Sequence, residues 1–106
     1  MGPTPRRFRP LARTRLLGFE VPVANTFPSR LLGLALLSRD RAGEGLLIPN
    51  CRSVHTFGVR FPLDLLFLDN GHRVVEIRRD VPPGEVCRCP AAEAVLEIPS
   101  PEPRTS

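Results

Sequence analysis

An Asn-Gly pair between two apolar runs is the feature that most constrains how this chain of 106 residues can fold. Residues 61–81 read FPLDLLFLDNGHRVVEIRRDV, and Asn70-Gly71 in that setting favours a two-residue type I′ hairpin, because both positions need positive φ. The turn sets the register, with Phe67 opposite Val74 and Asp64 opposite Ile77. One face then carries Leu63, Leu65, Phe67 and Val74, and the other carries Asp64, Leu66, Leu68, Val75 and Ile77. Both faces are largely apolar, so we expect this hairpin to lie inside a closed or two-layered sheet.

The rest of the chain is predicted to add short strands and one helix. Residues 16–24 alternate apolar side chains on one face, and Pro22 removes one ladder donor, which suits an edge strand. Residues 26–34 have a proline in the first turn, apolar residues at helical spacing and Gly33 at the end, which is typical of one or two helical turns. A loop over 35–45, strands over 45–49 and 51–57, and further strands within 81–99 complete the prediction. We therefore predict an all-β fold, a small barrel or sandwich-like single domain with one short helix near residues 26–34.

The net charge of +4 is concentrated at the N-terminus. Residues 1–16 contain five arginines and no acid, whereas residues 17–106 contain ten arginines against eleven acids. We therefore expect residues 1–16 to be a disordered basic tail, residues 17–98 to form the β domain and residues 99–106 to be a disordered proline-rich tail. The domain itself is not basic, and no apolar run is long enough for a signal peptide or a membrane span. We expect no nucleic-acid partner, no membrane, and a monomer in the cytoplasm.

A polar centre is expected where Asp64 points among aliphatic side chains. A buried carboxylate is costly without a hydrogen bond or a charge partner. The candidate partners are His55, Thr56 and Arg60, together with Arg30 from the predicted helix. We therefore predict a ligand- or partner-binding module, its ligand an unidentified small molecule or protein, with a binding centre of Arg30, Ser53, His55, Thr56 and Asp64.

Other interpretations of this centre stay open. His55 and Asp64 could act as a general acid-base pair in a small hydrolase-like enzyme, or they could form a satisfied polar plug without chemistry. A Cys51 nucleophile served by His55 is less favourable, because four residues along a strand span about 13 Å. Whether the protein is an enzyme is not decided by these residues.

The cysteines do not match a metal site. Cys51, His55, Cys87 and Cys89 lack the paired C-x2–4-C spacings that structural zinc sites use. Buried thiols more often behave as small apolar groups in a reducing compartment, so we expect no metal and no cofactor. A disulfide between Cys51 and Cys89 stays open, whereas Cys87 and Cys89 are poorly placed for an unstrained bond with each other.

The order and spacing of several motifs resemble one known family. The segments are T-F-P-S-R-L-L-G-L, G-x-G-L-L-I-P-x-C-R-S-V-H-T-F-G-V-R-F-P-L-D-L-L-F-L-D, R-V-V-E-I, V-P-P and A-x-x-V-L-E-I-P. Over residues 17–99 they resemble the domain of unknown function family 192, also called uncharacterised protein family 0127. The resemblance implies a small β-barrel or sandwich-like domain with a short helix after the first strand, and it implies no activity. Ser100 stands where many members have Gly, a departure that we expect to concern only the terminus.

Overall fold

A computed structural model describes residues 8–9, 11–25 and 33–101, and strands dominate this part of the chain. The strands are β1 (Arg13–Leu16), β2 (Phe19–Pro22), β3 (Leu46–Pro49), β4 (Ser53–His55), β5 (Leu63–Leu68), β6 (Val74–Val81), β7 (Val86–Arg88) and β8 (Ala94–Pro99), and the helix is α2 (Arg39–Ala42). The prediction of a mainly β single domain is therefore confirmed.

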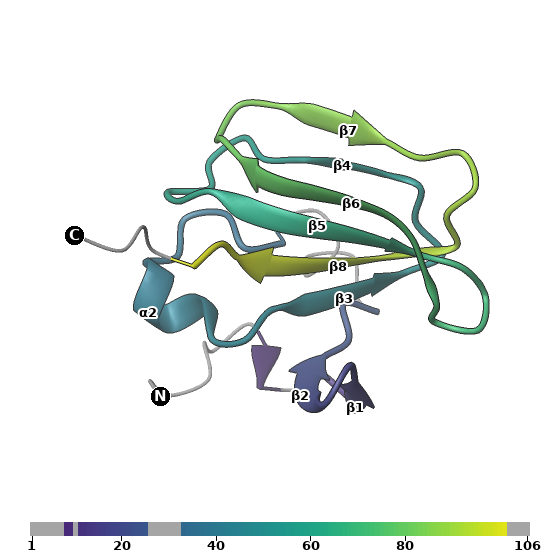
Figure 1. Cartoon of the computed structure of the whole chain (residues 1–106). Helices are drawn as coiled ribbons and strands as arrows, with labels where there is room; N and C mark the ends of the chain where they lie inside the picture. The colour runs from purple at the N-terminus through teal and green to yellow at the C-terminus, as the bar shows by residue number, and fades with distance from the viewer. Residues whose placement is uncertain (1–7, 10, 26–32, 102–106) are drawn as a thin grey trace.

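The strands form one four-stranded sheet and two two-stranded ribbons (Figure 1). The four-stranded sheet has the order β3-β8-β5-β6, and every neighbouring pair is antiparallel. The ribbons are β1-β2 and β4-β7, which are also antiparallel. Across the described residues these sheets do not close into a barrel, so that detail of the prediction is not found.

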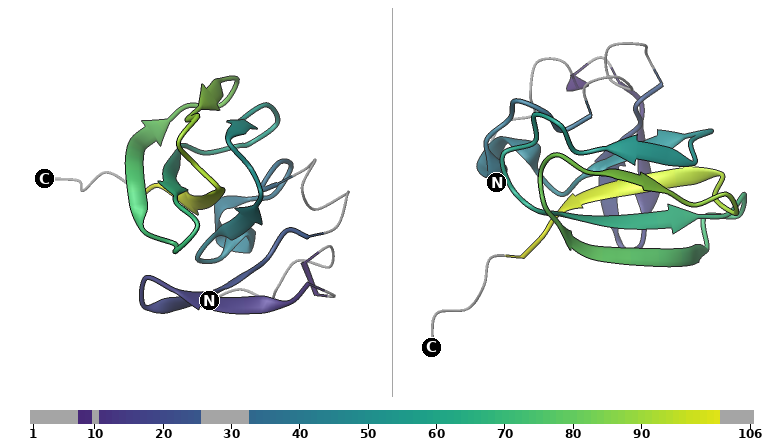
Figure 2. Two further views of the ribbon diagram at one scale, coloured as in Figure 1. Left: turned by 90° about the vertical axis from the view of Figure 1, so that its right-hand side faces the viewer. Right: turned by 90° about the horizontal axis from the view of Figure 1, so that it is seen from above.

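Two groups of buried side chains pack on opposite faces of the four-stranded sheet. The main core contains Phe67 of the sheet together with Val54 and Cys87 from the β4-β7 ribbon. The second core contains Leu68 of the sheet and Leu16 of the β1-β2 hairpin, which lies below the other strands in the left view of Figure 2. Because successive residues of a strand point to opposite faces, β5 contributes to both cores, and this explains why its sequence is apolar on both sides.

The turn between β5 and β6 differs from the predicted type I′ turn. The left-handed residue is His72, with φ 61°, and neither Asn70 nor Gly71 has a positive φ. The Asp69 side chain accepts hydrogen bonds from the backbone N–H groups of Gly71 at 2.8 Å and Arg73 at 2.9 Å. An Asp side chain that bonds the backbone ahead of it builds its own turn, so the loop becomes longer than two residues.

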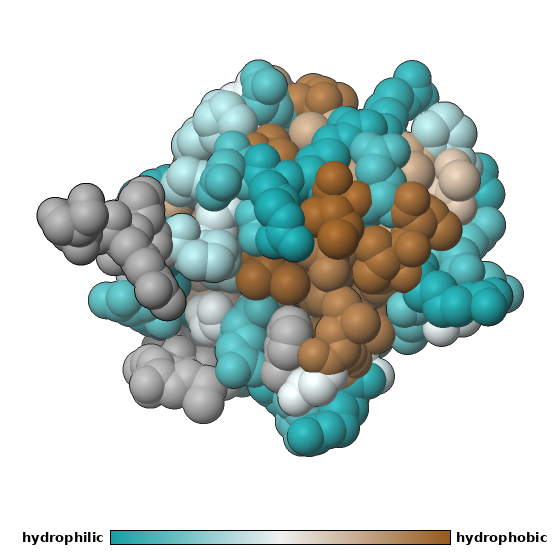
Figure 3. All heavy atoms as spheres, viewed as in Figure 1, coloured by the Kyte–Doolittle hydropathy of each residue, from teal (hydrophilic) through white to brown (hydrophobic). Residues whose placement is uncertain are grey.

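The register of β5 against β6 changes with this turn. Phe67 pairs with Glu76 rather than with Val74, a displacement of two residues. Because the displacement is even, Leu66 and Ile77 still share a face, as predicted. β6 is the last strand of its sheet, and Val75 and Ile77 are each 44% exposed, so only β5 lies inside the fold as predicted. Figure 3, which has the same viewpoint as Figure 1, shows apolar side chains gathered near the middle of the face turned toward the viewer.

Residues near the N-terminus take part in the fold, although we expected a disordered tail over residues 1–16. Phe8 and Leu11 are 2% and 6% exposed and lie in the main core, and residues 13–16 form β1. Leu17 and Gly18 join β1 to β2, and both have positive φ, as a type I′ turn requires. The first seven residues of the expected tail lie outside the described residues.

The ends of other expected segments also differ. β8 runs to Pro99 and Ser100 is 1% exposed, so the fold continues two residues beyond the expected end at residue 98. The helix expected near residues 26–34 falls mostly on 26–32, outside the described residues. The four-residue helix α2 lies within the segment that we expected to be a loop. In the described part of the chain, no helix has the length and apolar character needed to span a membrane.

Candidate functional site

Asp64 is buried as predicted, but its partners differ from those expected. Its Oδ1 accepts hydrogen bonds from the Ser100 hydroxyl at 2.7 Å and from the backbone N–H of Asp80 at 3.0 Å. Its Oδ2 lies 3.6 Å from Nη1 of Arg79. Among the described residues, no hydrogen bond or ion pair joins Asp64 to His55, the two residues of the alternative acid-base interpretation.

A β-bulge explains the position of these partners. The register between β5 and β6 shifts between Leu63 and Leu65, so that Arg79 and Asp80 together lie opposite Asp64. Asp80 is left-handed, with φ 53°. A bulge removes one N–H from the regular ladder, and the Asp64 carboxylate accepts it. Asp64 therefore has a structural role, because it joins β5 to the bulge in β6 and to the residue that follows β8.

His55 lies on the exposed side of β4, in a different sheet from Asp64. Its Nδ1 accepts the backbone N–H of Phe57 at 3.2 Å, and the centroids of the two rings are 5.6 Å apart. A neutral imidazole that accepts a hydrogen bond at Nδ1 carries its proton on Nε2. In this arrangement His55 offers a donor to the solvent and has no lone pair left to act as a general base.

Thr56, another predicted binding residue, is fully buried and holds a turn in place. Its hydroxyl donates to the carbonyl of Pro82 at 2.7 Å and accepts the backbone N–H of Glu85 at 2.8 Å. Its own backbone N–H donates to the carbonyl of Glu85 at 2.8 Å. A buried side chain with these bonds does not reach a ligand at the surface, and its effect is to fix the residues 82–85 that lead into β7.

The outer face of the β4-β7 ribbon carries four exposed side chains, Ser53, His55, Val86 and Arg88, and we call it the ribbon face. Ser53 lies directly opposite Arg88, and His55 lies opposite Val86. Val86 is 63% exposed, and Phe57, just beyond β4, is 54% exposed. The ribbon face therefore has an apolar end around His55 and a polar end around Ser53. Both of these residues belong to the predicted binding centre.

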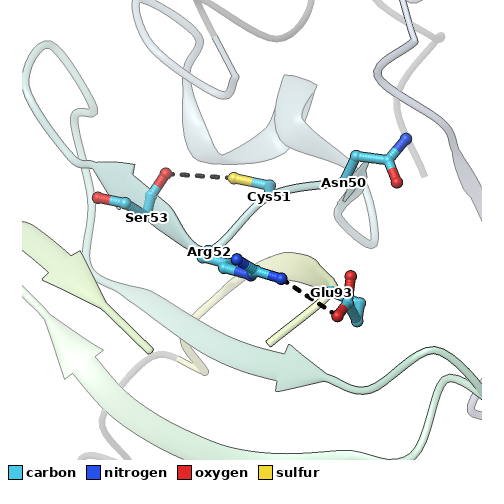
Figure 4. A pocket seen from close by; sticks show the side chains of 5 residues that line it. All are labelled: Asn50, Cys51, Arg52, Ser53 and Glu93. Atoms are coloured by element: carbon cyan, nitrogen blue, oxygen red, sulfur yellow. Dashed lines mark hydrogen bonds and ion pairs between the residues drawn. The ribbon is translucent and has the colours of Figure 1, made fainter. Parts of the chain in front are cut away.

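Two hollows adjoin the polar end of the ribbon face. The larger has a volume of about 450 Å³ and is lined by Asn50, Cys51, Arg52, Ser53 and Glu93 (Figure 4). The smaller has a volume of about 290 Å³ and is lined by Arg52, Ser53, Arg88 and Pro90. Arg52 and Ser53 line both hollows, so a molecule in either one contacts the start of β4.

Hydrogen bonds orient Arg52 and Cys51 at the larger hollow (Figure 4). Nε of Arg52 donates to the carbonyl of Ala92 at 3.0 Å, and its Nη2 lies 3.3 Å from Oε1 of Glu93. These contacts use two of the five N–H groups of the guanidinium. The Cys51 thiol donates to the backbone carbonyl of Ser53 at 3.1 Å. The hollow is therefore lined by donors and acceptors with set directions.

Sequence reasoning missed a second buried carboxyl group, that of Glu97. β8 places it between Leu46 of β3 and Leu65 of β5, and the residue is 3% exposed. Its Oε1 has no hydrogen-bond partner in the described part of the chain, and a Cβ on Gly33 would lie 2.9 Å from it. Burial raises the pKa of Glu97 to about 7, although a hydrogen bond from the backbone of Leu34 lowers it. The available signal was an acid inside the apolar run AVLEIP.

The other predicted groups have the following positions. Arg30 lies outside the described residues. Cys87 and Cys89 are buried thiols in the main core. Within residues 8–9, 11–25 and 33–101, no group of three or more His, Cys, Asp or Glu side chains could hold a metal ion.

Comparisons with known proteins agree on the fold and name no activity. The family model of domain of unknown function 192 (DUF192), described as an uncharacterised ACR, matches residues 11–102. A crystal structure of a protein of unknown function from Novosphingobium aromaticivorans is similar, with a TM-score of 0.61 and 20% identity over 93% of this chain and 89% of that one. At this identity the likeness concerns the fold alone. No curated protein matches the chain.

Proposed function

The chain belongs to domain of unknown function family 192, and we propose that it is a binding module that takes a small ligand on the ribbon face. The observation that carries the proposal is the exposure of apolar side chains around His55. Val86 is 63% exposed and Phe57 is 54% exposed, and both lie next to the imidazole ring. Apolar surface beside a few directed polar groups is typical of ligand sites.

The size of this surface favours a small ligand over a folded protein partner. β4 and β7 have three residues each, which corresponds to a length of about 10 Å. A stable protein interface needs about 800 Å² on each partner, far more than a ribbon of that size offers. The larger hollow beside the polar end of the ribbon face has a volume of about 450 Å³, which is within the range of about 300–1,000 Å³ that is usual for ligand pockets.

The contacts of the two acid-base candidates support binding rather than hydrolysis. Both nitrogens of a neutral His55 are assigned, one as the acceptor of the Phe57 N–H and the other as a donor. Asp64 is occupied by Ser100 and by the bulge at Asp80. A general base needs a free lone pair within reach of the proton that it takes from the substrate, and in the described contacts Nδ1 of His55 and Oδ1 of Asp64 already accept hydrogen bonds. In the proposed role, the Nε2–H of His55 donates a hydrogen bond to the ligand.

The test is a titration of the full ¹⁵N-labelled chain with uncharged aromatic and aliphatic fragments, followed by NMR. We expect the amide signals of residues 52–57 and 85–89 to shift, because these residues form and flank the ribbon face. Phe57→Ser should weaken the binding of aromatic fragments at least fivefold. The matched control is Val75→Ser, which removes an exposed apolar side chain from β6 and should leave the affinity unchanged. Fragment shifts centred on β6, or equal affinity in both variants, would contradict the proposal.

A further inference from the structure

We infer that the smaller hollow, between Arg52 and Arg88, binds an oxyanion, the carboxylate or phosphate group of the ligand. This inference rests on the proposed function, because it names the chemistry that the polar end of the ribbon face recognises. The hollow has a volume of about 290 Å³, which is enough for a single carboxylate or phosphate group.

The residues around the smaller hollow supply hydrogen-bond donors and positive charge. Arg52, Arg88, Ser53 and Pro90 line it, and none of them is acidic. In the described part of the chain, the Arg88 guanidinium makes no hydrogen bond or ion pair. Two guanidinium groups and a hydroxyl form a donor set that suits carboxylate and phosphate oxygens, which arginine binds in a bidentate way. An anion here would also reduce the repulsion between the two cations.

Arg52 is held in place before any ligand binds. The carbonyl of Ala92 accepts the Nε–H of Arg52 at 3.0 Å, which leaves most of its remaining N–H groups for a ligand. The β4-β7 pairing places Ser53 directly across from Arg88. A group that is already oriented loses less conformational entropy on binding, so Arg52 needs little rearrangement to receive an anion, and Arg88 is free to turn toward it.

Glu93 is the group that opposes anion binding. Its carboxylate lies 3.3 Å from Nη2 of Arg52 and is half-exposed. It therefore competes with an incoming oxyanion for the same guanidinium. This competition gives the inference a directional test, because removing the Glu93 charge should strengthen binding, whereas removing the Arg88 charge should weaken it.

The spacing along β4 relates the anion site to the apolar end of the ribbon face. Ser53 and His55 are two residues apart on one face of the strand, which corresponds to about 7 Å. A ligand with an oxyanion at one end and an apolar group about that far away can contact Arg88 and Val86, which lies opposite His55, at the same time. We therefore assign the ligand to the class of small amphiphilic anions.

The experiment uses inorganic phosphate as the probe and the full chain, at constant ionic strength maintained with sodium chloride. NMR follows the backbone amides and the Nε–H signals of the arginines. We expect saturable shifts at Arg52, Ser53 and Arg88. Arg88→Gln should weaken phosphate binding at least fivefold, and Glu93→Gln should strengthen it two- to tenfold. The matched control is Arg41→Gln, which removes an exposed charge on α2 and should leave the affinity unchanged.

Several outcomes would overturn the inference. These are shifts spread evenly over the surface arginines, no shift at Arg52 and Arg88, or a Glu93→Gln variant that binds phosphate more weakly. The two proposals fail separately. If uncharged fragments bind around Phe57 while phosphate does not bind, the ribbon face remains the ligand site and only the proposed oxyanion site is wrong. If phosphate binds and the fragments do not, the apolar half of the ligand site is wrong.

Discussion

The Ser100 hydroxyl donates a hydrogen bond of 2.7 Å to Oδ1 of Asp64, so the residue after β8 secures a carboxylate near the start of β5. The two residues are 1% and 6% exposed. The backbone N–H of Ser100 also donates to the carbonyl of Pro62 at 2.9 Å, which holds the serine in place. Our expectation that Ser100 concerns only the terminus is therefore wrong, because its side chain satisfies a buried acid that would be costly without partners.

The first prediction is that Ser100→Ala and Asp64→Asn destabilise the protein and that their effects overlap. Loss of the serine hydroxyl should lower the free energy of unfolding by about 1–2 kcal/mol, and loss of the Asp64 charge by about 1–3 kcal/mol, because each leaves a buried partner unsatisfied. The double variant should lose less than the sum of the two, since both substitutions remove the same hydrogen bond. Urea melts of the three variants measure these differences.

The control for this set is Asp40→Asn, which removes an exposed carboxylate on α2. It should fall within about 0.5 kcal/mol of the wild type. If Asp64→Asn is as close to the wild type as this control, the Asp64 carboxylate is solvated and its bonds to Ser100 and Asp80 do not stabilise the fold.

The second prediction concerns Glu97 and the pH. The fold raises the pKa of this carboxyl from its usual 4.5 to about 7 because it is buried, so folding favours the protonated form. The resulting stabilisation is complete below pH 4.5 and is lost as the pH rises through about 7. The gap between the two pKa values corresponds to about 3 kcal/mol. The free energy of unfolding should therefore be lower at pH 8 than at pH 5, and ionisation of Glu97 should account for part of this difference.

Urea melts of the wild type and Glu97→Gln at pH 5 and pH 8 isolate this contribution. The amide does not titrate, so the variant should lose less stability than the wild type when the pH is raised. Glu85→Gln removes an exposed carboxylate and should keep the wild-type pH dependence. Identical pH dependence in the wild type and Glu97→Gln would mean that Glu97 is ionised in the fold at both pH values.

Local sequence patterns predicted the strands and the burial of Asp64, because both features depend on residues that are close in the sequence. The sequence of β5 is apolar at successive positions, and successive side chains of a strand point to opposite faces. The two cores on opposite faces of the sheet follow directly from this. The exact turn could not be read from the Asn70-Gly71 dipeptide. Asp69 competes for the same backbone N–H groups, and the balance between two turn geometries depends on that side chain.

The partners of the buried acids depend on contacts that are distant in the sequence. Ser100 is 36 residues from Asp64, and the N–H of Asp80 becomes available only because β6 contains a bulge. No period or spacing in the sequence indicates a bulge. The same limit explains Glu97, because a lone acid in the run AVLEIP becomes significant only when β3 and β5 are known to flank β8.

The third prediction concerns the turn that leads into β7. Thr56→Val keeps the shape of the side chain and removes the hydroxyl that bonds Pro82 and Glu85. The free energy of unfolding should fall by about 1–3 kcal/mol, because the Pro82 carbonyl and the Glu85 N–H, both part-buried, lose their partner. Thr56→Ser keeps the hydroxyl and should recover most of that loss. Equal stability of the valine and serine variants would contradict a role for the hydroxyl bonds.

The last prediction is that removal of residues 1–16 destabilises the protein strongly, contrary to the expectation that these residues form a disordered tail. Phe8 and Leu11 are in the main core, and loss of a buried phenylalanine side chain alone costs about 3–5 kcal/mol. For a domain of this size, about 1 kcal/mol changes the melting temperature by about 4–8 °C, so Phe8→Ala should lower it by roughly 12 °C or more. A chain that begins at residue 8 keeps both side chains and should melt within a few degrees of the full chain. If calorimetry finds that a chain beginning at residue 17 melts as the full chain does, then the packing of Phe8 and Leu11 does not stabilise this fold and β1 is not required for it.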